Sequence, residues 1–183
     1  MKQTLLIFLL LLISGCGIST EKAMEKGLML FDADQKREAY PYLEKAYSGG
    51  TEDPELFCKL AFCRIAVTGD PSGAIDLLRD NVVKFPDYAP TYHQLGLIAY
   101  EFDPVEDNKN LHQAIFFARK AVKFDPYEWS YCENLGTYLY LIGEKDSALV
   151  WFKSASELNL TNDELVKHIN EIEKMLEGKN SSE

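Results

Sequence analysis

A small residue recurs at regular intervals along this chain of 183 residues, and this recurrence constrains the fold more than any other feature. Each small residue lies within an apolar stretch of helical periodicity, and an alanine follows it. The small residues are Gly27, Ala61, Gly96 and Gly136, and the alanines are Ala39, Ala74, Ala114 and Ala148. The distance from an alanine to the next small residue is 22 residues in all three cases. A constant distance of this kind predicts helical hairpins that stack side by side.

The distance within a unit, from the small residue to its alanine, varies more. It is 12 residues in the first and fourth units, 13 in the second and 18 in the third. A loop inside a hairpin accepts insertions, because the stacking of units does not constrain its length. The extra residues of the third unit are therefore expected in its internal loop, at 102–110.

The residues around these positions resemble the tetratricopeptide repeat, a family of paired helices. The fourth unit matches the small and large positions of that repeat at Leu135, Gly136, Tyr138, Gly143, Ala148, Phe152 and Ala155. The third matches at Tyr92, Leu95, Gly96, Ala114, Ala121 and Pro126, the second at Leu60, Ala61, Ala74, Leu78 and Pro86, and the first at Gly27, Ala39, Leu43 and Ala46. The resemblance implies an all-α fold, a right-handed solenoid of about four hairpins followed by a C-terminal capping helix.

Helix packing rules predict the same architecture from the residues alone. A small residue lets two helix backbones approach, and large residues three and four places away fill the space beside it. We therefore expect Gly136 and Ala148 to touch across the fourth hairpin. Pro86 and Pro126 are expected to end the second helix of their units, because proline cannot continue the helical hydrogen bonds. No stretch alternates apolar and polar residues for long enough to predict a strand.

The same patterns divide the chain into segments. Four repeat-like units within 20–160 are predicted at about 20–53, 54–87, 88–127 and 128–160. Thr161 and Glu164 then form a capping-box pattern, which predicts the start of a further helix. This helix, at 161–177, has a narrow apolar stripe and a charged outer face, as a terminal capping helix requires. The tail at 178–183 is predicted to be disordered.

The first residues differ in character from the rest. The run 5–13 is almost wholly apolar and is too short to cross a bilayer as a helix. It leads into the motif ISGC, which ends at Cys16 and resembles the lipobox of bacterial lipoproteins. The resemblance implies that residues 1–15 are a signal peptide and that Cys16 is the lipidated N-terminus of a short linker, 16–19. An ordinary buried helix or an uncleaved anchor is the alternative interpretation.

The lipobox resemblance also implies a location. Two or more acyl chains hold a protein on a membrane stably, so a transmembrane helix is not required. Gly17 stands where aspartate is the usual inner-membrane retention signal of enterobacterial lipoproteins. The chain is therefore predicted to be anchored by lipid in a bacterial cell envelope, at an outer membrane and facing the periplasm if the cell is Gram-negative.

Charge and motif content argue against nucleic acid as a partner and against catalysis. The chain has 29 acidic and 19 basic residues, and its formal net charge of −10 repels phosphate backbones. The three histidines lie in no metal-binding motif, and neither a phosphate-binding glycine loop nor a nucleophile elbow is present. The polar insert at 102–110 suggests calcium, but it lacks the EF-hand spacing and glycine. We therefore predict no cofactor, no metal and no enzymatic activity.

The cysteines other than Cys16 are predicted to be core residues. Cys58, Cys63 and Cys132 have neither CxxC nor zinc-ligand spacing. Cys58 and Cys63 are five residues apart in one expected helix, so their side chains point in different directions. All three are interpreted as small apolar residues, with a disulfide or redox role as the alternative.

A solenoid of this family is expected to bind other proteins in a concave groove lined by the first helix of each hairpin. The resemblance assigns to this groove Met24, Leu28, Phe31, Phe62, Ile65, His93, Leu97, Tyr100, Thr137, Tyr140 and Leu141. The set is largely apolar and lacks the lysine and asparagine residues with which chaperone-binding members hold a C-terminal carboxylate. An apolar helix or extended segment of another envelope protein is therefore the expected partner.

The sequence as a whole predicts a membrane-anchored interaction scaffold or assembly factor. Two alternatives belong to other classes. One is an enzyme, or an accessory of a cell-wall hydrolase, with a site that the motifs do not reveal; two titratable residues buried together in a cleft would favour it. The other is a purely structural lipoprotein, which would capture no protein partner.

Overall fold

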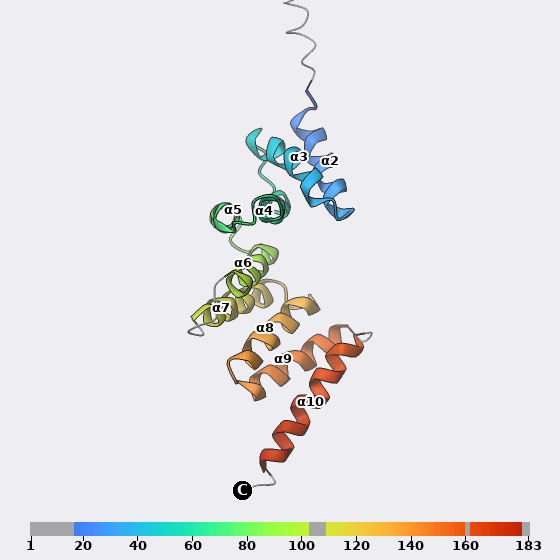
Figure 1. Ribbon diagram of the computed structural model, residues 1–183, viewed down its shortest axis with the longest axis vertical. Coiled ribbons are helices and arrows are strands. Elements are labelled where there is room, and N and C mark those ends of the chain that lie inside the picture. Colours follow the sequence, from blue (N-terminus) through green and yellow to red (C-terminus); the bar gives the residue numbers. More distant parts are fainter. Residues whose placement is uncertain (1–16, 103–108, 160–161, 181–183) are drawn as a thin grey trace, which may run out of the picture.

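A computed structural model describes residues 17–102, 109–159 and 162–180 (Figure 1). This part of the chain folds into nine α-helices and contains no strand, which confirms the predicted all-α fold. The helices are α2 (Thr20–Asp32), α3 (Lys36–Ser48), α4 (Pro54–Thr68), α5 (Ser72–Lys84), α6 (Ala89–Glu101), α7 (Lys109–Phe124), α8 (Trp129–Leu141), α9 (Lys145–Leu158) and α10 (Asp163–Asn180). The predicted signal peptide at 1–15, the lipid acceptor Cys16 and most of the insert lie outside the described residues.

The helices pair into consecutive hairpins. α2 packs on α3, α4 on α5, α6 on α7 and α8 on α9. Each hairpin also contacts the next along the chain, so that the four hairpins follow one another along the long axis of the molecule (Figure 1). α10 packs on α9 at the C-terminal end of this row. The predicted helical solenoid is therefore confirmed.

Local sequence explains where several helices begin and end. The Asp53 carboxylate accepts hydrogen bonds from the backbone nitrogens of Glu55 and Leu56, at 2.8 Å and 3.2 Å, and thereby caps α4. Gly69 follows α4 with a φ of 70°, a left-handed conformation that glycine adopts without strain. α5 and α7 end two residues before Pro86 and Pro126, as the prolines predicted.

In the described part of the chain, buried apolar side chains form two clusters. The first core cluster runs from α3 through α4 and α5 to one side of α6. The second core cluster starts on α6 and continues through α7, α8 and α9 to α10. α6 therefore contributes to both clusters, and Val82 and Phe117 pack against both. We call this junction between the second and third hairpins the seam.

The small residues of the repeat contact their partner helices in two different ways. A Cβ atom built on Gly27 would lie 2.5 Å from Cδ2 of Leu43, and one built on Gly136 would lie 2.9 Å from ring carbons of Phe152. A Cβ atom on Gly96 would instead lie 3.4 Å from the carbonyl oxygen of Ala114. Ala148 was the predicted neighbour of Gly136, but the nearest side chain to Gly136 is that of Phe152, one helical turn further along α9. The Phe152 ring fills the space that glycine leaves open.

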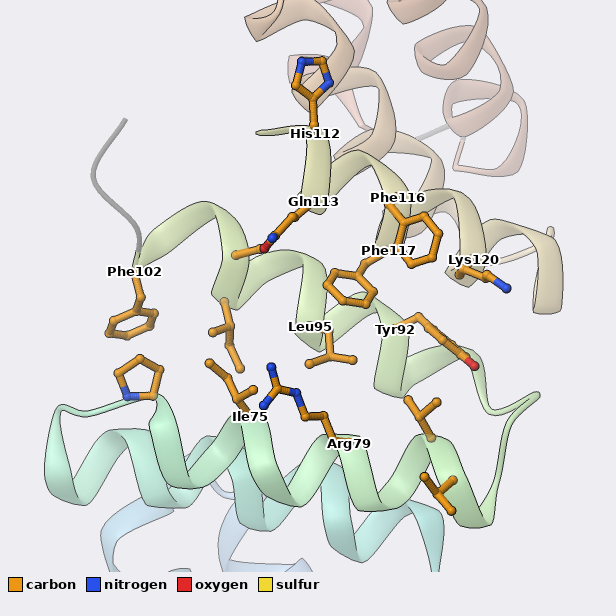
Figure 2. A pocket seen from close by; sticks show the side chains of 15 residues that line it. Ile75, Arg79, Tyr92, Leu95, Phe102, His112, Gln113, Phe116, Phe117 and Lys120 are labelled. Carbon is orange, nitrogen blue, oxygen red and sulfur yellow. The ribbon is translucent and has the colours of Figure 1, made fainter. Parts of the chain in front are cut away.

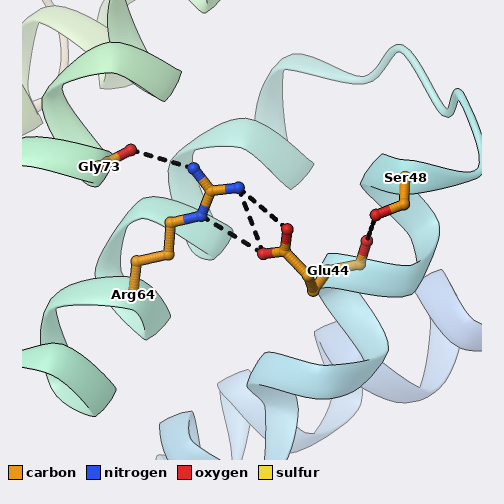
Figure 3. A network of polar contacts seen from close by, with 4 residues as sticks. All are labelled: Glu44, Ser48, Arg64 and Gly73. Atoms are coloured by element: carbon orange, nitrogen blue, oxygen red, sulfur yellow. Dashed lines mark hydrogen bonds and ion pairs between the residues drawn. The ribbon is translucent and has the colours of Figure 1, made fainter.

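Polar contacts fix how the first and second hairpins stack. Arg64 on α4 donates from Nη2 and Nε to the two carboxylate oxygens of Glu44 on α3, at 3.1 Å and 3.3 Å (Figure 3). Its Nη1 donates to the carbonyl oxygen of Gly73 on α5, at 3.1 Å. This bidentate geometry fixes the orientation of α4 relative to α3. It adds little to the free energy of unfolding, because both side chains remain partly exposed.

A buried polar network joins the second hairpin to the third at the seam. The side-chain amide of Asn81 on α5 donates to the carbonyl oxygen of Pro54 at 3.0 Å and to the hydroxyl of Thr91 on α6 at 2.8 Å. Asn81 and Thr91 are both fully buried, so losing either partner would leave a polar group without its hydrogen bond. The network therefore specifies how α6 sits on α4 and α5.

The last helix differs in two details from its prediction. The side-chain oxygen of Asn162 accepts a hydrogen bond from the Leu165 nitrogen at 3.1 Å, which makes Asn162 the cap, while the predicted cap Thr161 lies outside the described residues. The helix continues to Asn180, beyond the predicted end at residue 177. A glycine such as Gly178 weakens a helix by about 1 kcal/mol without forbidding it.

Candidate functional site

The eleven residues predicted to line the groove form what we call the first-helix face. They lie on α2, α4, α6 and α8, the first helices of the four hairpins, and none of them is fully buried. Nine are half-buried, while Tyr100 and Leu141 are 38% and 46% exposed. All eleven therefore keep surface that a partner can reach, although no contact in this structure tests their role in binding.

Ring contacts connect α2 with α4 on this face. The ring centroids of Phe31 and Phe62 are 6.2 Å apart. The ammonium nitrogen of Lys59 lies 5.2 Å from the centre of the Phe31 ring and 2.6 Å from a carboxylate oxygen of Asp32. Lys59 is thus engaged twice within this part of the face, as a cation over a ring and as an ion-pair partner.

Ring contacts also connect α6 with α8. The rings of His93 and Tyr131 are 4.7 Å apart, and those of Tyr100 and Tyr138 are 5.2 Å apart. The side-chain nitrogen of Asn134 lies 2.8 Å from Nε2 of His93. An amide nitrogen donates, so this contact requires a neutral imidazole, and burial lowers the pKa of His93 to about 4.

The connection between α4 and α6 is of a different kind. Here the buried Thr91 hydroxyl lies 3.5 Å from Sγ of Cys58, beneath the surface rather than on it. Burial also raises the pKa of the Cys58 thiol to about 11, which keeps it protonated and unreactive at neutral pH. Cys58, Cys63 and Cys132 are all buried and free, as expected for apolar core residues.

A pocket at the seam was not predicted from the sequence. It lies between α5, α6 and α7 and has a volume of about 1070 Å³ (Figure 2). The pocket is lined by Tyr92 and Leu95 of α6 and by Phe102, the residue that follows this helix. The first-helix face uses His93, Leu97 and Tyr100 of the same helix. Of the four basic residues of α7, only Lys120 is among the described residues that line the pocket, so the basic character of this helix did not reveal the pocket.

Other kinds of site leave no trace in the described part of the chain. No group of three or more histidine, cysteine, aspartate or glutamate residues there has the arrangement of a metal site. Within the same residues, no helix combines the length and the apolar character needed to span a bilayer. The lipid acceptor Cys16 and the centre of the polar insert, 103–108, lie outside this part, so both predictions stay predictions.

Solved structures with a similar fold are tetratricopeptide proteins. MamA 41-end from Desulfovibrio magneticus RS-1 has a TM-score of 0.70 and 14% identity, over 90% of this chain and 89% of that one. TTC0263, a thermophilic protein of Thermus thermophilus, has a TM-score of 0.68 and 22% identity, over 86% and 83%. YrrB, described as having an unusual peptide-binding site, has a TM-score of 0.62 and 19% identity, over 84% and 75%.

These likenesses define the class of the fold. The chain has the fold of tetratricopeptide repeat proteins, as the repeat spacing predicted. No protein-family model matches the chain. No curated protein matches its sequence. The comparisons therefore support the architecture, and function is argued from the chain's own surfaces.

Proposed function

We propose that this protein is a non-enzymatic scaffold that binds other proteins through the first-helix face. The observation that carries the proposal is the set of ring contacts between first helices, Phe31 with Phe62 and Tyr100 with Tyr138. They join the first helix of the first hairpin to that of the second, and that of the third to that of the fourth, while part of each hairpin's contribution stays exposed. Aromatic residues held in this way are common anchors of protein interfaces.

The chemistry of the face favours an apolar segment as the partner. Its exposed members, Tyr100 and Leu141, are an aromatic and an aliphatic residue. Lys59 is already paired with Asp32 and Glu55, and Asn134 with His93, so both are held by this chain's own side chains rather than presented to a C-terminal carboxylate. YrrB, a protein of the same fold, has a peptide-binding site, which supports peptide recognition as a use of this architecture.

The proposal includes an anchor and a location. Cys16, at the end of the ISGC motif, would carry the lipid, and the described helices begin four residues later at Thr20. This short linker would hold the repeats close to the membrane surface. With Gly17 after the cysteine, the location we propose is a bacterial envelope, at the outer membrane in a Gram-negative cell.

The anchor is tested by the Cys16→Ser variant expressed in its own cells. The parent is expected in the membrane fraction with an acylated N-terminus detectable by mass spectrometry. The variant is expected to lose the acyl groups and to leave that fraction. A variant that is still processed and bound to membranes like the parent would show that Cys16 is not the anchor.

The binding surface is tested by cross-linking the lipidated protein in native cells and identifying what is captured. The affinity of the captured partner is then measured for Tyr140→Ala and for Tyr127→Ala, a matched control whose tyrosine is 81% exposed in the loop before α8. Tyr140→Ala is expected to weaken binding by at least about 1 kcal/mol, and Tyr127→Ala to leave it unchanged. If Tyr140→Ala bound the partner as tightly as the parent and the Tyr127→Ala control do, the interface would lie elsewhere.

Tyr100→Ala is a less clean test than Tyr140→Ala. Its ring also packs on Tyr138 of the next hairpin, so the substitution changes stacking as well as surface. It is therefore measured together with its thermal unfolding. The expected result is a loss of binding by a variant that circular dichroism shows to be folded, with a melting temperature somewhat below that of the parent.

A further inference from the structure

The seam pocket has an apolar floor that is held in place by the fold. Leu95 and Ile98 on α6 are buried and belong to the first core cluster. Tyr92, also buried, belongs to the second, and its hydroxyl donates to the carbonyl oxygen of Pro86 at 2.6 Å. The floor therefore joins both core clusters and cannot shift freely, which makes the pocket a preformed feature of the stack.

Among the described residues, the charged side chains that line the pocket are cations. Arg79 extends from α5 toward Leu95 of α6, and Lys120 of α7 lies at the outer end of the pocket (Figure 2). The ammonium nitrogen of Lys120 lies 5.8 Å from the centre of the Phe116 ring, and no ion pair joins it to any described carboxylate. Arg79 meets Asp76 of its own helix at 3.5 Å, with both side chains largely exposed, so that contact holds it weakly.

The edges of the pocket are apolar and exposed. Val83 on α5 and Phe116 on α7 are 81% and 56% exposed, although both line the pocket. A small molecule on the floor would leave these edges in water. A peptide segment is long enough to cover floor and edges together, which removes apolar surface from water on both helices.

We propose that the seam pocket docks a short peptide segment of another protein. The segment presents apolar side chains to the floor and carboxylates to Arg79 and Lys120. The sign of the partner's charge follows from Arg79 and Lys120, the two charged residues among the described lining. This surface lies on a different side of α6 from the first-helix face, so the two can be occupied independently.

The test starts with a library of random peptides displayed on phage, selected on the full chain in detergent. Enriched peptides are synthesised with a fluorescent label, and their dissociation constants are measured by anisotropy. We expect a class of peptides that combines leucine or aromatic residues with aspartate or glutamate. Their affinity is expected to fall as salt is raised, because salt screens exposed charges.

Matched variants assign that class to the pocket. Lys120→Glu is expected to weaken binding at least about tenfold, whereas Arg119→Glu, the same charge change one residue earlier and outside the lining, is not. Val83→Asp is expected to weaken binding in the same way. Its control is Val150→Asp, at a valine of α9 that is 61% exposed. Circular dichroism and the melting temperature establish that each variant is folded.

Three outcomes would overturn the proposal. The first is that no enriched class carries acidic residues. The second is that such peptides bind Lys120→Glu as tightly as the parent, or lose affinity in Tyr140→Ala, which would assign them to the first-helix face. The third is self-association of the parent that Lys120→Glu abolishes, since the occupant would then be a second copy of this chain.

Discussion

The third and fourth hairpins place the same small residue, a glycine on the first helix, against different partners. In the fourth hairpin Gly136 faces the ring of Phe152, whose carbons would lie 2.9 Å from an added Cβ atom. In the third hairpin Gly96 faces the backbone of α7, with the Ala114 oxygen at 3.4 Å and the Ala118 nitrogen at 3.7 Å from such an atom. Glycine therefore makes room for a side chain in one hairpin and lies beside backbone in the other.

The two hairpins differ because of the residue four places after the repeat's alanine. This position holds Leu43, Leu78, Ala118 and Phe152 in the four hairpins, and all four side chains are buried. Where it is large, the side chain fills the space beside the small residue of the first helix. Where it is alanine, as in the third hairpin, backbone is the nearest neighbour. The comparison shows that the packing of the two helices in a hairpin depends on the combined size of the two facing side chains, not on either one alone.

Removing the large partner from the fourth hairpin is expected to have the largest effect. Phe152→Ala leaves a cavity opposite Gly136 and removes the ring that lies 6.1 Å from the ring of His168 on α10. We expect a loss of about 3 to 5 kcal/mol in the free energy of unfolding, measured by urea denaturation. A loss below about 1 kcal/mol would mean that the hairpin closes without its ring.

Adding a large partner to the third hairpin is expected to cost less. Ala118→Leu forces a side chain into a site that is already filled by the approach of α7 to Gly96. Overpacking of this kind costs about 1 to 3 kcal/mol. The control is Ala66→Leu at a half-buried position of α4, expected to change stability by less than about 0.5 kcal/mol. Equal effects of the two substitutions would contradict the tight approach.

Adding one methyl group to the fourth hairpin is expected to have a smaller effect. Gly136→Ala places a Cβ atom against the Phe152 ring, and the gain in helix propensity offsets part of the clash. We expect a net loss of about 0.5 to 2 kcal/mol. Combining it with Phe152→Leu should recover part of that loss, which a double-mutant cycle measures. Additive effects would show that the two side chains do not meet.

The same methyl group in the third hairpin is expected to have the smallest effect. At Gly96 the added atom would sit at ordinary contact distance from α7. Alanine is also the better helix former, so Gly96→Ala should leave stability unchanged or raise it by up to about 1 kcal/mol. The melting temperatures of Gly96→Ala and Gly136→Ala, measured side by side, provide the check. Destabilisation by Gly96→Ala as large as that by Gly136→Ala would remove the distinction between the hairpins.

The sequence by itself determined the helical hairpins and their order along the chain. The constant distance of 22 residues showed the repeat, and the prolines predicted where α5 and α7 end. These features are local: periodicity shows which face of a helix is apolar, and proline stops a helix wherever it stands. For the same reason the first helices could be assigned before the structure was known, whereas the role of the first-helix face in binding stays a prediction.

Only the tertiary structure decided which side chains meet and where a pocket opens. Phe152 rather than Ala148 is the nearest neighbour of Gly136, and Arg79 and Lys120 line one pocket although they lie on different hairpins. Both results depend on side-chain sizes summed across helices that are distant in sequence. Periodicity records the direction of a side chain but not the size of what faces it, so the seam and its pocket could not be read from the spacing of the repeat.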